Sequence, residues 1–245
     1  MSMNINLLLG FLGFIYGHTL SGAALIPDNL RILDKEKPIG IFSATFDPLA
    51  NSHVNTIEAI KDIFQAILVV PADRNPLKNP ETSLQQRYQF VNEYYKNDTK
   101  VLTPTFSQFA PDIPIFEKKR VGKSIQYLEN KGFEVHGIAY IDDLNSQIIG
   151  PIKRIVLGIR IPVSHWLILA PTEKSFREFP FTWVFRHRTL LIHPTPASTK
   201  SIRNYFKEHP EYFRDDTELD RITEGELPIP LVIKQIIHKQ KLYLE

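Results

Sequence analysis

One short segment, Ser43 to His53, holds the side chains best suited to chemistry; it reads SATFDPLANSH. Asp47 supplies a carboxylate and His53 an imidazole, with a short apolar run before the segment and an apolar helical period after it. Asn51 and Ser52 are typical N-cap residues, which places His53 in or just before a first helical turn. The unpaired N–H groups of such a turn, with the helix dipole behind them, attract anions. The pattern therefore predicts a phosphate-handling site. A turn opened by Asp47 and a first-turn histidine without a ligand are the alternative.

The elements that must position this segment form a strand–helix–strand unit. Ile39 to Phe42 is the first apolar strand, and the following helix carries Ile57, Ile60 and Phe64 on one face. Ala66 to Val70 is a continuous apolar run, typical of a strand buried on both faces of a parallel sheet. Further strands are expected near residues 101–103, 134–141, 166–169 and 188–192, with helices near 83–95 and 227–243. These elements predict an α/β protein.

The segment SATFDPLANSH resembles the GGTFDPxHxGH signature of the nucleotidyltransferase superfamily, and most of all its nicotinate/nicotinamide mononucleotide adenylyltransferases. The matching positions are Thr45, Phe46, Asp47, Pro48, Asn51 and His53. The positions that differ are Ser43 and Ala44 for the two glycines, Ala50 for the first histidine, and Ser52 for the glycine before the second histidine. The resemblance implies a Rossmann-like α/β fold with a doubly wound, mostly parallel sheet.

The same resemblance assigns roles within the segment. The residues implied to contact the nucleotide and its phosphates are Phe42, Ser43, Ala44, Thr45 and Phe46. His53 is implied to be catalytic, because the family's histidines meet phosphate oxygens and stabilise charge in the transition state. Restoring the first imidazole with Ala50→His is therefore expected to raise transfer about tenfold to a thousandfold.

A second segment, HPTPASTKSIRNYF from His193 to Phe206, resembles the ISSTxxR segment that opens a phosphate-binding helix in the family. Ser198 and Arg203 match, whereas Thr199 replaces a serine. We expect Ser198 to cap this helix, and Ser198 and Thr199 to hold phosphates. Arg203 is expected to be catalytic, as a clamp on the phosphates.

Weaker correspondences complete the candidate site. Lys78, in the loop PADRNPLK after the second strand, is expected to meet phosphates, with a solvated charged loop as the alternative. Asp142 or Asp143, after the fourth strand, corresponds to a carboxylate of the mononucleotide pocket, with a helix N-cap as the alternative. Arg87 is expected to position its helix. The tail from Leu227 to Tyr243 resembles the family's closing helix.

Composition and charge exclude several kinds of partner and chemistry. The chain has 29 Lys and Arg against 27 Asp and Glu, a net charge of +2, which argues against a dedicated nucleic-acid binder. It has no cysteine, which excludes disulfides, thiolate zinc sites and thiol nucleophiles. The expected partners are small-molecule nucleotides, and the resemblance assigns no metal ligand to the chain.

Residues 1–38 are expected to form an extension before a single domain at 39–245. Leu7 to Tyr16 is an apolar run followed by Ser21-Gly22-Ala23, as in a secretory signal, but no Lys or Arg precedes it. The alternatives are a membrane anchor through residues 7–16 and a helix packed on the domain. The expected location is the cytoplasm, or outside it or at a membrane if the run is a signal or an anchor.

The resemblance implies adenylyl transfer from ATP to nicotinate or nicotinamide mononucleotide, with release of pyrophosphate. Mg²⁺ bridges phosphates in such chemistry. A relative that acts on another phosphate, such as phosphopantetheine, is a further possibility within the superfamily. The four replaced residues of the signature favour an alternative from another class: a degenerate family member that binds a nucleotide or a partner without turnover.

Overall fold

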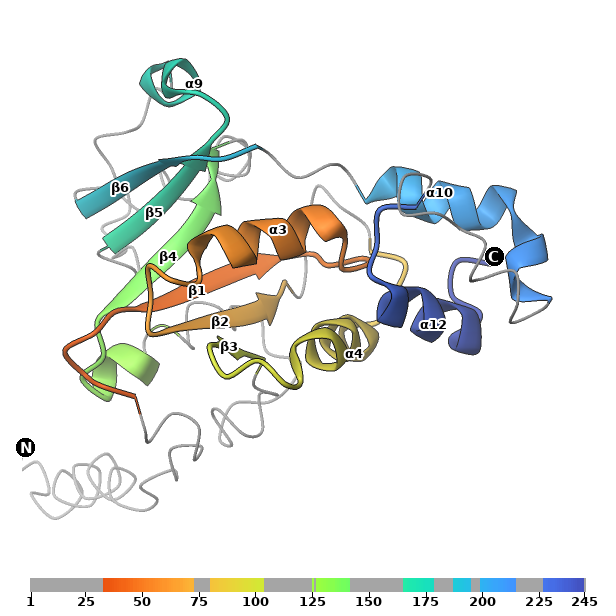
Figure 1. The fold of residues 1–245 in the computed structure, drawn as a ribbon, viewed down its shortest axis with the longest axis horizontal. Helices are drawn as coiled ribbons and strands as arrows, with labels where there is room; N and C mark the ends of the chain where they lie inside the picture. The colour runs from red at the N-terminus through yellow and green to blue at the C-terminus, as the bar shows by residue number, and fades with distance from the viewer. Residues whose placement is uncertain are drawn as a thin grey trace, which may run out of the picture. The chain divides into compact units, whose positions relative to one another are not determined.

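Parallel strands form one sheet (Figure 1). The computed structural model describes residues 33–72, 80–103, 125, 127–141, 165–178, 187–194, 199–214 and 227–244. In this part of the chain the strands are β1 (Ile39–Ala44), β2 (Ala66–Pro71), β3 (Val101–Leu102), β4 (Val135–Tyr140), β5 (His165–Ala170) and β6 (His187–Ile192).

The strand order is β3-β2-β1-β4-β5-β6, and every neighbouring pair is parallel. This is the order of a doubly wound sheet, so the predicted fold class is confirmed. The chain reverses its direction of travel across the sheet between β1 and β4. In open parallel sheets, ligands bind beyond the carboxyl ends of the strands at such a switch point.

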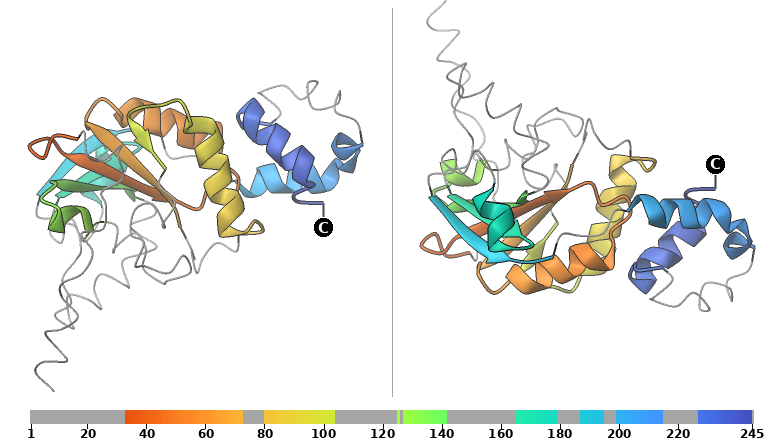
Figure 2. Two further views of the ribbon diagram at one scale, coloured as in Figure 1. Left: turned by 90° about the horizontal axis from the view of Figure 1, so that it is seen from below. Right: turned by 90° about the horizontal axis from the view of Figure 1, so that it is seen from above.

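The helices are α3 (Asn51–Ile60), α4 (Leu84–Tyr95), α9 (Glu173–Arg177), α10 (Lys200–Glu208) and α12 (Leu231–Gln240), with a 3₁₀ turn η2 (Pro210–Phe213). Figures 1 and 2 show α3 lying along one face of the sheet beside β1. The predicted helix near 83–95 is confirmed, because α4 begins after Ser83, whose hydroxyl accepts the Gln86 N–H.

The core lies where α3 and the C-terminal helices pack with the central strands. All six residues of β2 are buried, as its continuous apolar run predicts. A Cβ at Gly40 of β1 would lie 2.7 Å from Ile138 Cδ1 and 2.8 Å from Phe64 Cδ2. Glycine at this position therefore lets neighbouring side chains close over the strand.

Two helix boundaries differ from the sequence expectation. The N-cap of α3 is Ala50 rather than Asn51 or Ser52, which lie inside the first turn. The helix also ends at Ile60, so Phe64 packs in the core from the turn that follows rather than from the helical face. Propensity favoured the polar residues as caps, but contacts from distant segments fix this helix start, as described below.

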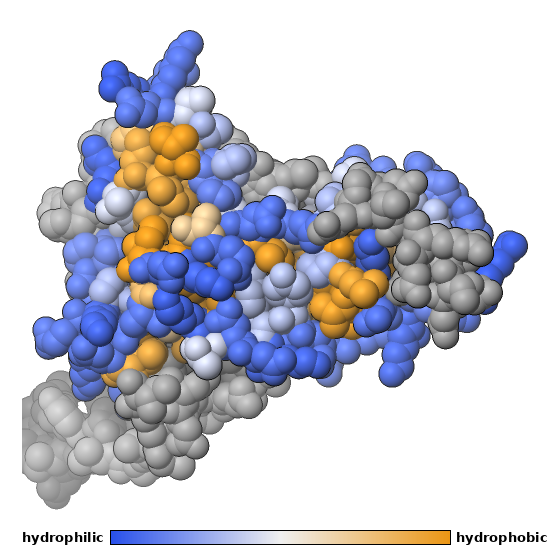
Figure 3. Space-filling view, in the orientation of Figure 1, coloured by the Kyte–Doolittle hydropathy of each residue, from blue (hydrophilic) through white to orange (hydrophobic). Residues whose placement is uncertain are grey.

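Apolar side chains also reach the surface of the described structure. Figure 3 shows a hydrophobic area over the β5–β6 side of the sheet. Ile192, at the end of β6, is 50% exposed, and Leu231, at the start of α12, is 53% exposed. Among the helices described, none combines the length and the apolar character needed to cross a membrane. Residues 1–32, which include the apolar run, lie outside the described residues, so the predicted extension stays a prediction.

Candidate nucleotide site

The loop that leaves β1 lies at the switch point of the sheet. Phe46 has a positive φ of 50°, which is uncommon for a residue with a side chain. Its ring is fully buried and packs edge-on against Phe42 and against the imidazole of His53, with centroids 5.9 and 5.2 Å away. Aromatic packing therefore holds the loop in place, and the His53 ring is part of that packing.

His53 is the third residue of α3 and completes its start. Its Nδ1 accepts the Ala50 N–H at 3.2 Å, and its own N–H donates to the Ala50 carbonyl at 2.9 Å. This is the position from which Glu or Gln reaches back to the N-cap in a capping box. A neutral imidazole that accepts at Nδ1 carries its proton on Nε2. The helix start therefore fixes His53 as a donor through Nε2.

The N-terminal N–H groups of α3 are less open to an anion than the sequence suggested. Asn51 donates its N–H to the carbonyl of Pro228 at 2.9 Å, and His53 donates its N–H to the carbonyl of Ala50 at 2.9 Å. The segment before α12 thus lies across the start of α3 and satisfies a donor that was expected to be unpaired. The dipole of α3 still favours an anion at this helix start, where His53 lies.

Asp47 is the central group of the site, and its carboxylate is completely buried. Oδ2 accepts the Glu81 N–H at 2.8 Å and lies 3.2 Å from Nη1 of Arg203. Oδ1 accepts the hydroxyls of Thr82 at 2.6 Å and Tyr243 at 2.9 Å. A buried charge is stable only when it is paired and hydrogen-bonded. This carboxylate therefore joins the β1 loop to the start of α4, to α10 and to the C-terminal tail.

Arg203 is bound to protein groups on both sides of its guanidinium. Nη1 donates to the Asp47 carbonyl at 3.0 Å, and Nε donates to Glu81 Oε1 at 3.2 Å. The other oxygen of Glu81 pairs with Lys207 at 2.8 Å, one turn further along α10. The sequence predicts that Arg203 acts as a clamp on the phosphates. In this arrangement it fastens α10 to the β1 loop.

Arg87 acts as predicted, by holding α4 in place. Its side chain is buried, and Nη1 donates to the carbonyls of Thr45 and Ala72. These carbonyls lie just after the carboxyl ends of β1 and β2. One guanidinium thus joins α4 to two loops at the switch-point edge of the sheet.

The remaining candidate residues fall into three groups. The side chains of Phe42 and Phe46 are core, at 1% and 0% exposure, so only their backbone could meet a nucleotide. Ser43 and Ala44 are half-buried at the end of β1, with Thr45 buried beside them. The candidate residues that lie outside the described residues are Lys78, Ser198, Asp142 and Asp143.

The second helix start also differs from the expectation. Thr199, not Ser198, occupies the N-cap position of α10, and its side chain makes no capping hydrogen bond. The Thr199 hydroxyl instead accepts from Nη1 of Arg203 at 3.4 Å. Thr199 is thus brought to the Asp47–Arg203 pair, which the sequence did not anticipate.

Ala50→His is expected to lower the melting temperature rather than raise transfer. Ala50 is 2% exposed and belongs to the main core cluster, so an imidazole there must displace packed neighbours. Overpacking of this kind costs about 1–3 kcal/mol. Ala50→Ser is the matched control, because a hydroxyl suits the N-cap position and should leave stability equal or higher. Thermal melting checks both variants. A faster Ala50→His enzyme with an unchanged melting temperature would contradict this packing argument.

Tyr243 is expected to make the protein sensitive to alkali. Burial, and next the charge of Asp47, raise the pKa of its phenol above the ordinary 10.0. Because the folded-state pKa is raised, the native state keeps a proton that the unfolded chain loses, and stability falls as the pH rises above about 10. Burial raises the pKa of Tyr95 in the same direction.

Melting curves at pH 8 and pH 10.5 test this linkage. Tyr243→Phe should melt lower than the native chain at pH 8, because it loses the hydrogen bond to Asp47, yet show a shallower drop at pH 10.5. Tyr95→Phe should also show the shallower drop, without the loss at pH 8, because the Tyr95 hydroxyl is buried with no hydrogen-bond partner among the described residues. Equal drops in all three proteins would refute the assignment.

The described residues do not fit a resident Mg²⁺ at this edge of the sheet. Asp47 is enclosed by donors, and Glu81 is shared between Arg203 and Lys207. Neither carboxylate has the free oxygens that Mg²⁺ requires. A Mg²⁺ ion that bridges the phosphates of a substrate would not need these two carboxylates.

The parts that sequence reasoning missed are Glu81, Thr82 and Tyr243. Glu81 and Thr82 follow the loop after β2, and Tyr243 lies at the end of the tail. In both places the sequence shows only ordinary polar residues. The one available signal was the resemblance of the tail to the family's closing helix. The structure gives that resemblance a physical content, since Tyr243 donates to the Asp47 carboxylate.

A doubly wound parallel sheet with a loop and a helix start at its switch point defines an open α/β protein that binds its ligand at the carboxyl ends of the strands. The comparison with known families narrows this class. The cytidylyltransferase-like family model matches residues 41–204, from β1 into α10. The chain belongs to the cytidylyltransferase-like family, and the resemblance to the nucleotidyltransferase superfamily is confirmed.

Similar sequences include phosphopantetheine adenylyltransferases. The one of Actinobacillus pleuropneumoniae serotype 3 (strain JL03) is 31% identical over 108 residues, which cover 44% of this chain and 60% of the relative. That of Carboxydothermus hydrogenoformans is 28% identical over 115 residues, with 45% and 60% covered. The chain thus spans about 60% of the length of these curated relatives.

Among solved structures, the fold is similar to that of nicotinic acid mononucleotide adenylyltransferase of Plasmodium falciparum complexed with APC. The TM-score is 0.55 at 15% identity, and the match covers 84% of this chain and 97% of the other. The same enzyme complexed with NaAD gives a TM-score of 0.54. At this identity the likeness establishes the fold.

Proposed function

We propose that the protein transfers the adenylyl group of ATP to the phosphate of a small acceptor and releases pyrophosphate. The observation that carries this proposal is His53, whose Nδ1 accepts the Ala50 N–H at the start of α3, beside the β1 loop at the switch point. In the reaction an acceptor phosphate oxygen attacks the α-phosphorus, and the bond to the β-phosphate oxygen breaks. No covalent intermediate with the protein is needed.

The chain contributes position and charge to this displacement. His53 donates its Nε2–H to a phosphate oxygen, and the dipole of α3 adds positive potential along the same direction. The Asp47–Arg203 pair holds the β1 loop and α10 together, so that both segments keep their places around the nucleotide. Lys78, Ser198, Asp142 and Asp143 retain the roles that the resemblance gives them, as proposals.

The acceptor that we place first is nicotinate mononucleotide, and nicotinamide mononucleotide after it. The support is the TFDPxxxxH segment, the segment around Arg203 and the closing tail, in the family's order. Phosphopantetheine is the second candidate, because the similar sequences include phosphopantetheine adenylyltransferases. The location that we propose is the cytoplasm.

A second candidate function is nucleotide binding without turnover. The observations that favour it are the buried Ala50 in place of the first histidine, and the Pro228 carbonyl on the first N–H of α3. Both reduce what the site can offer to a phosphate. Loss of one preorganised donor costs about a hundredfold or more in rate, which leaves a weak enzyme rather than none.

Product analysis with a panel of acceptors tests the proposal. The protein is incubated with ATP, Mg²⁺ and, in separate reactions, each mononucleotide or phosphopantetheine, and the adenylylated product is identified by its mass. We expect one acceptor to give product. Calorimetric titration with ATP runs in parallel. Binding of ATP with no product from any acceptor supports the second candidate, and absence of both overturns the nucleotide site itself.

A further inference from the structure

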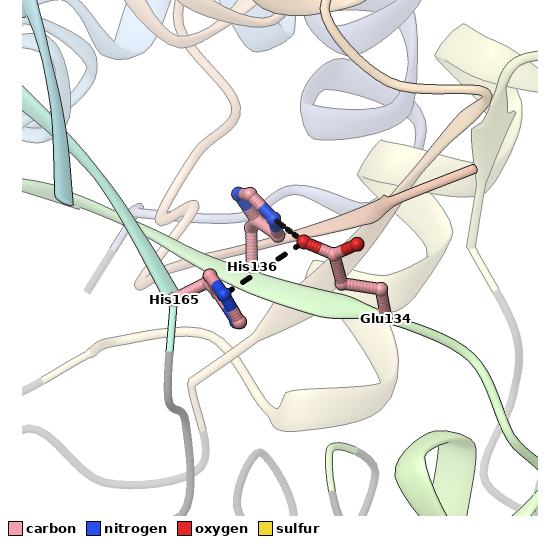
Figure 4. A group of neighbouring side chains, drawn as sticks. All are labelled: Glu134, His136 and His165. Carbon is pink, nitrogen blue, oxygen red and sulfur yellow. Dashed lines mark hydrogen bonds and ion pairs between the residues drawn. The ribbon is translucent and has the colours of Figure 1, made fainter. Parts of the chain in front are cut away.

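A group of metal-ligand side chains lies at the opposite edge of the sheet from the nucleotide site. Glu134 immediately precedes β4, His136 is its second residue, and His165 is the first residue of β5. The amino ends of parallel strands lie on one edge and their carboxyl ends on the other. Figure 4 shows the three side chains pointing toward one another. This group takes no part in the site described above.

The sheet itself brings the three side chains together. Residues 134 and 136 are two apart on an extended segment, and such residues share a face. His136 and His165 are paired in the register of β4 and β5, so they also lie side by side on one face. Their rings are stacked with centroids 5.0 Å apart, and Phe64 packs edge-on against His136 at 5.6 Å. Two strands and a core aromatic thus preorganise the imidazoles.

The distances from the Glu134 oxygen to the two histidine nitrogens are close to the distances between ligand atoms around one bound cation. Glu134 Oε1 lies 2.7 Å from Nε2 of His136 and 3.9 Å from Nε2 of His165, and one ligand atom from each residue falls within 4.8 Å of the others. Ligands about 2.0–2.1 Å from a tetrahedral Zn²⁺ lie roughly 3.3 Å from one another. To bind one ion, the end of Glu134 must move away from His136 and toward His165, and the stacked imidazoles must rotate so that one nitrogen of each points at the ion.

We propose that Glu134, His136 and His165 bind one divalent transition-metal ion of the Zn²⁺ class. Two imidazoles and one carboxylate are a donor set that Zn²⁺ takes with water as the fourth ligand. The same set does not suit Mg²⁺, which prefers oxygen ligands. The residues are 46%, 19% and 35% exposed in their side chains, so an ion can enter and a water position remains open. The ion ties the beginnings of β4 and β5 together.

Glu134 and His136 already share a hydrogen bond, with Oε1 2.7 Å from Nε2. That hydrogen bond is also the competing account of the cluster, in which Nε2–H of His136 donates to Glu134 and no ion is bound. The two accounts differ in a direct way. Only the metal site predicts saturable binding that depends on His165.

Calorimetric titration of the metal-free, tag-free full-length protein separates them. With ZnCl₂ we expect one ion per chain, and with MgCl₂ no saturable heat. The variants H136A, H165A and E134Q should each weaken Zn²⁺ binding about tenfold or more. H209A is the matched control, since His209 and Glu211 form a hydrogen-bonded pair with the same spacing at 2.8 Å but are not part of the three-residue group. It should bind Zn²⁺ as the native chain does.

Thermal melting and Co²⁺ spectra give independent readouts. Zn²⁺ at a hundredfold excess over its Kd should raise the melting temperature of the native chain by about 5 °C or more. Co²⁺ should give the strong visible bands of a tetrahedral site, and Zn²⁺ should remove them. Both effects need only the native protein, so they decide the question even if a variant fails to fold. Equal Zn²⁺ binding by native, H165A and H136A proteins, or no saturable binding by the native chain, overturns the site.

Discussion

Asp47→Ala is expected to lower the free energy of unfolding by about 3–5 kcal/mol, the usual cost of breaking a buried ion pair from one side. The substitution removes the carboxylate that pairs with the guanidinium of Arg203 and accepts the hydroxyls of Thr82 and Tyr243. For a chain of this size the melting temperature should fall by about 6–20 °C. Adenylyl transfer should fall with it, because the β1 loop loses its attachment to α10 and to the tail.

Asp47→Asn refines this prediction. The amide keeps the shape of the carboxylate but turns an NH₂ group toward donors, so it should destabilise the protein almost as strongly as alanine does. Asp62→Asn is the control: this exposed carboxylate pairs with Lys100 at 2.6 Å, and its loss should leave melting nearly unchanged. Melting temperatures for Asp47→Ala and Asp62→Asn that agree within error would show that Asp47 does not hold these segments together.

His53→Ala is expected to reduce adenylyl transfer about a hundredfold or more, mainly through kcat, because in the proposed mechanism His53 donates to the phosphates. It also removes the acceptor of the Ala50 N–H, at a cost of about 1 kcal/mol. His53→Gln separates the two roles. Glutamine at this position reaches back to the N-cap, so it should restore the melting temperature without restoring the native rate.

His209→Ala serves as the control for His53→Ala, because His209 lies at the end of α10 and pairs with Glu211 rather than with the β1 loop. Its transfer rate should match that of the native chain. If His53→Gln recovers both stability and rate, His53 is a cap of α3 and nothing more. The catalytic assignment would then fall while the fold assignment stands.

Much of the fold could be predicted because its signals are local. The apolar run of β2 and the stripe of Leu84, Tyr88, Val91 and Tyr95 on α4 indicate their own burial, and all are buried. The position of the β1 loop at the switch point follows from the parallel order. The ends of α3 did not follow, because Pro228, distant in the sequence, satisfies its first N–H.

The candidate site was predictable only in part, for the same reason. The motif identified Asp47 and His53, but the partners of Asp47 are Thr82 and Tyr243, 35 and 196 residues away along the chain. No spacing rule in the sequence connects them. Likewise, Glu134 and His136 carry no metal signal until the register of β4 and β5 sets His165 beside them.

The most direct measurement of the central claim is the initial rate of pyrophosphate release, with ATP, Mg²⁺ and the preferred acceptor, in the native protein and in His53→Gln. The two proteins should have the same fold and melting temperature, so that only the chemistry of residue 53 differs. We predict acceptor-dependent release by the native chain at a rate about a hundredfold or more above that of His53→Gln. No acceptor-dependent release by the native chain, or equal rates in both proteins, would contradict the claim that this helix start performs adenylyl transfer.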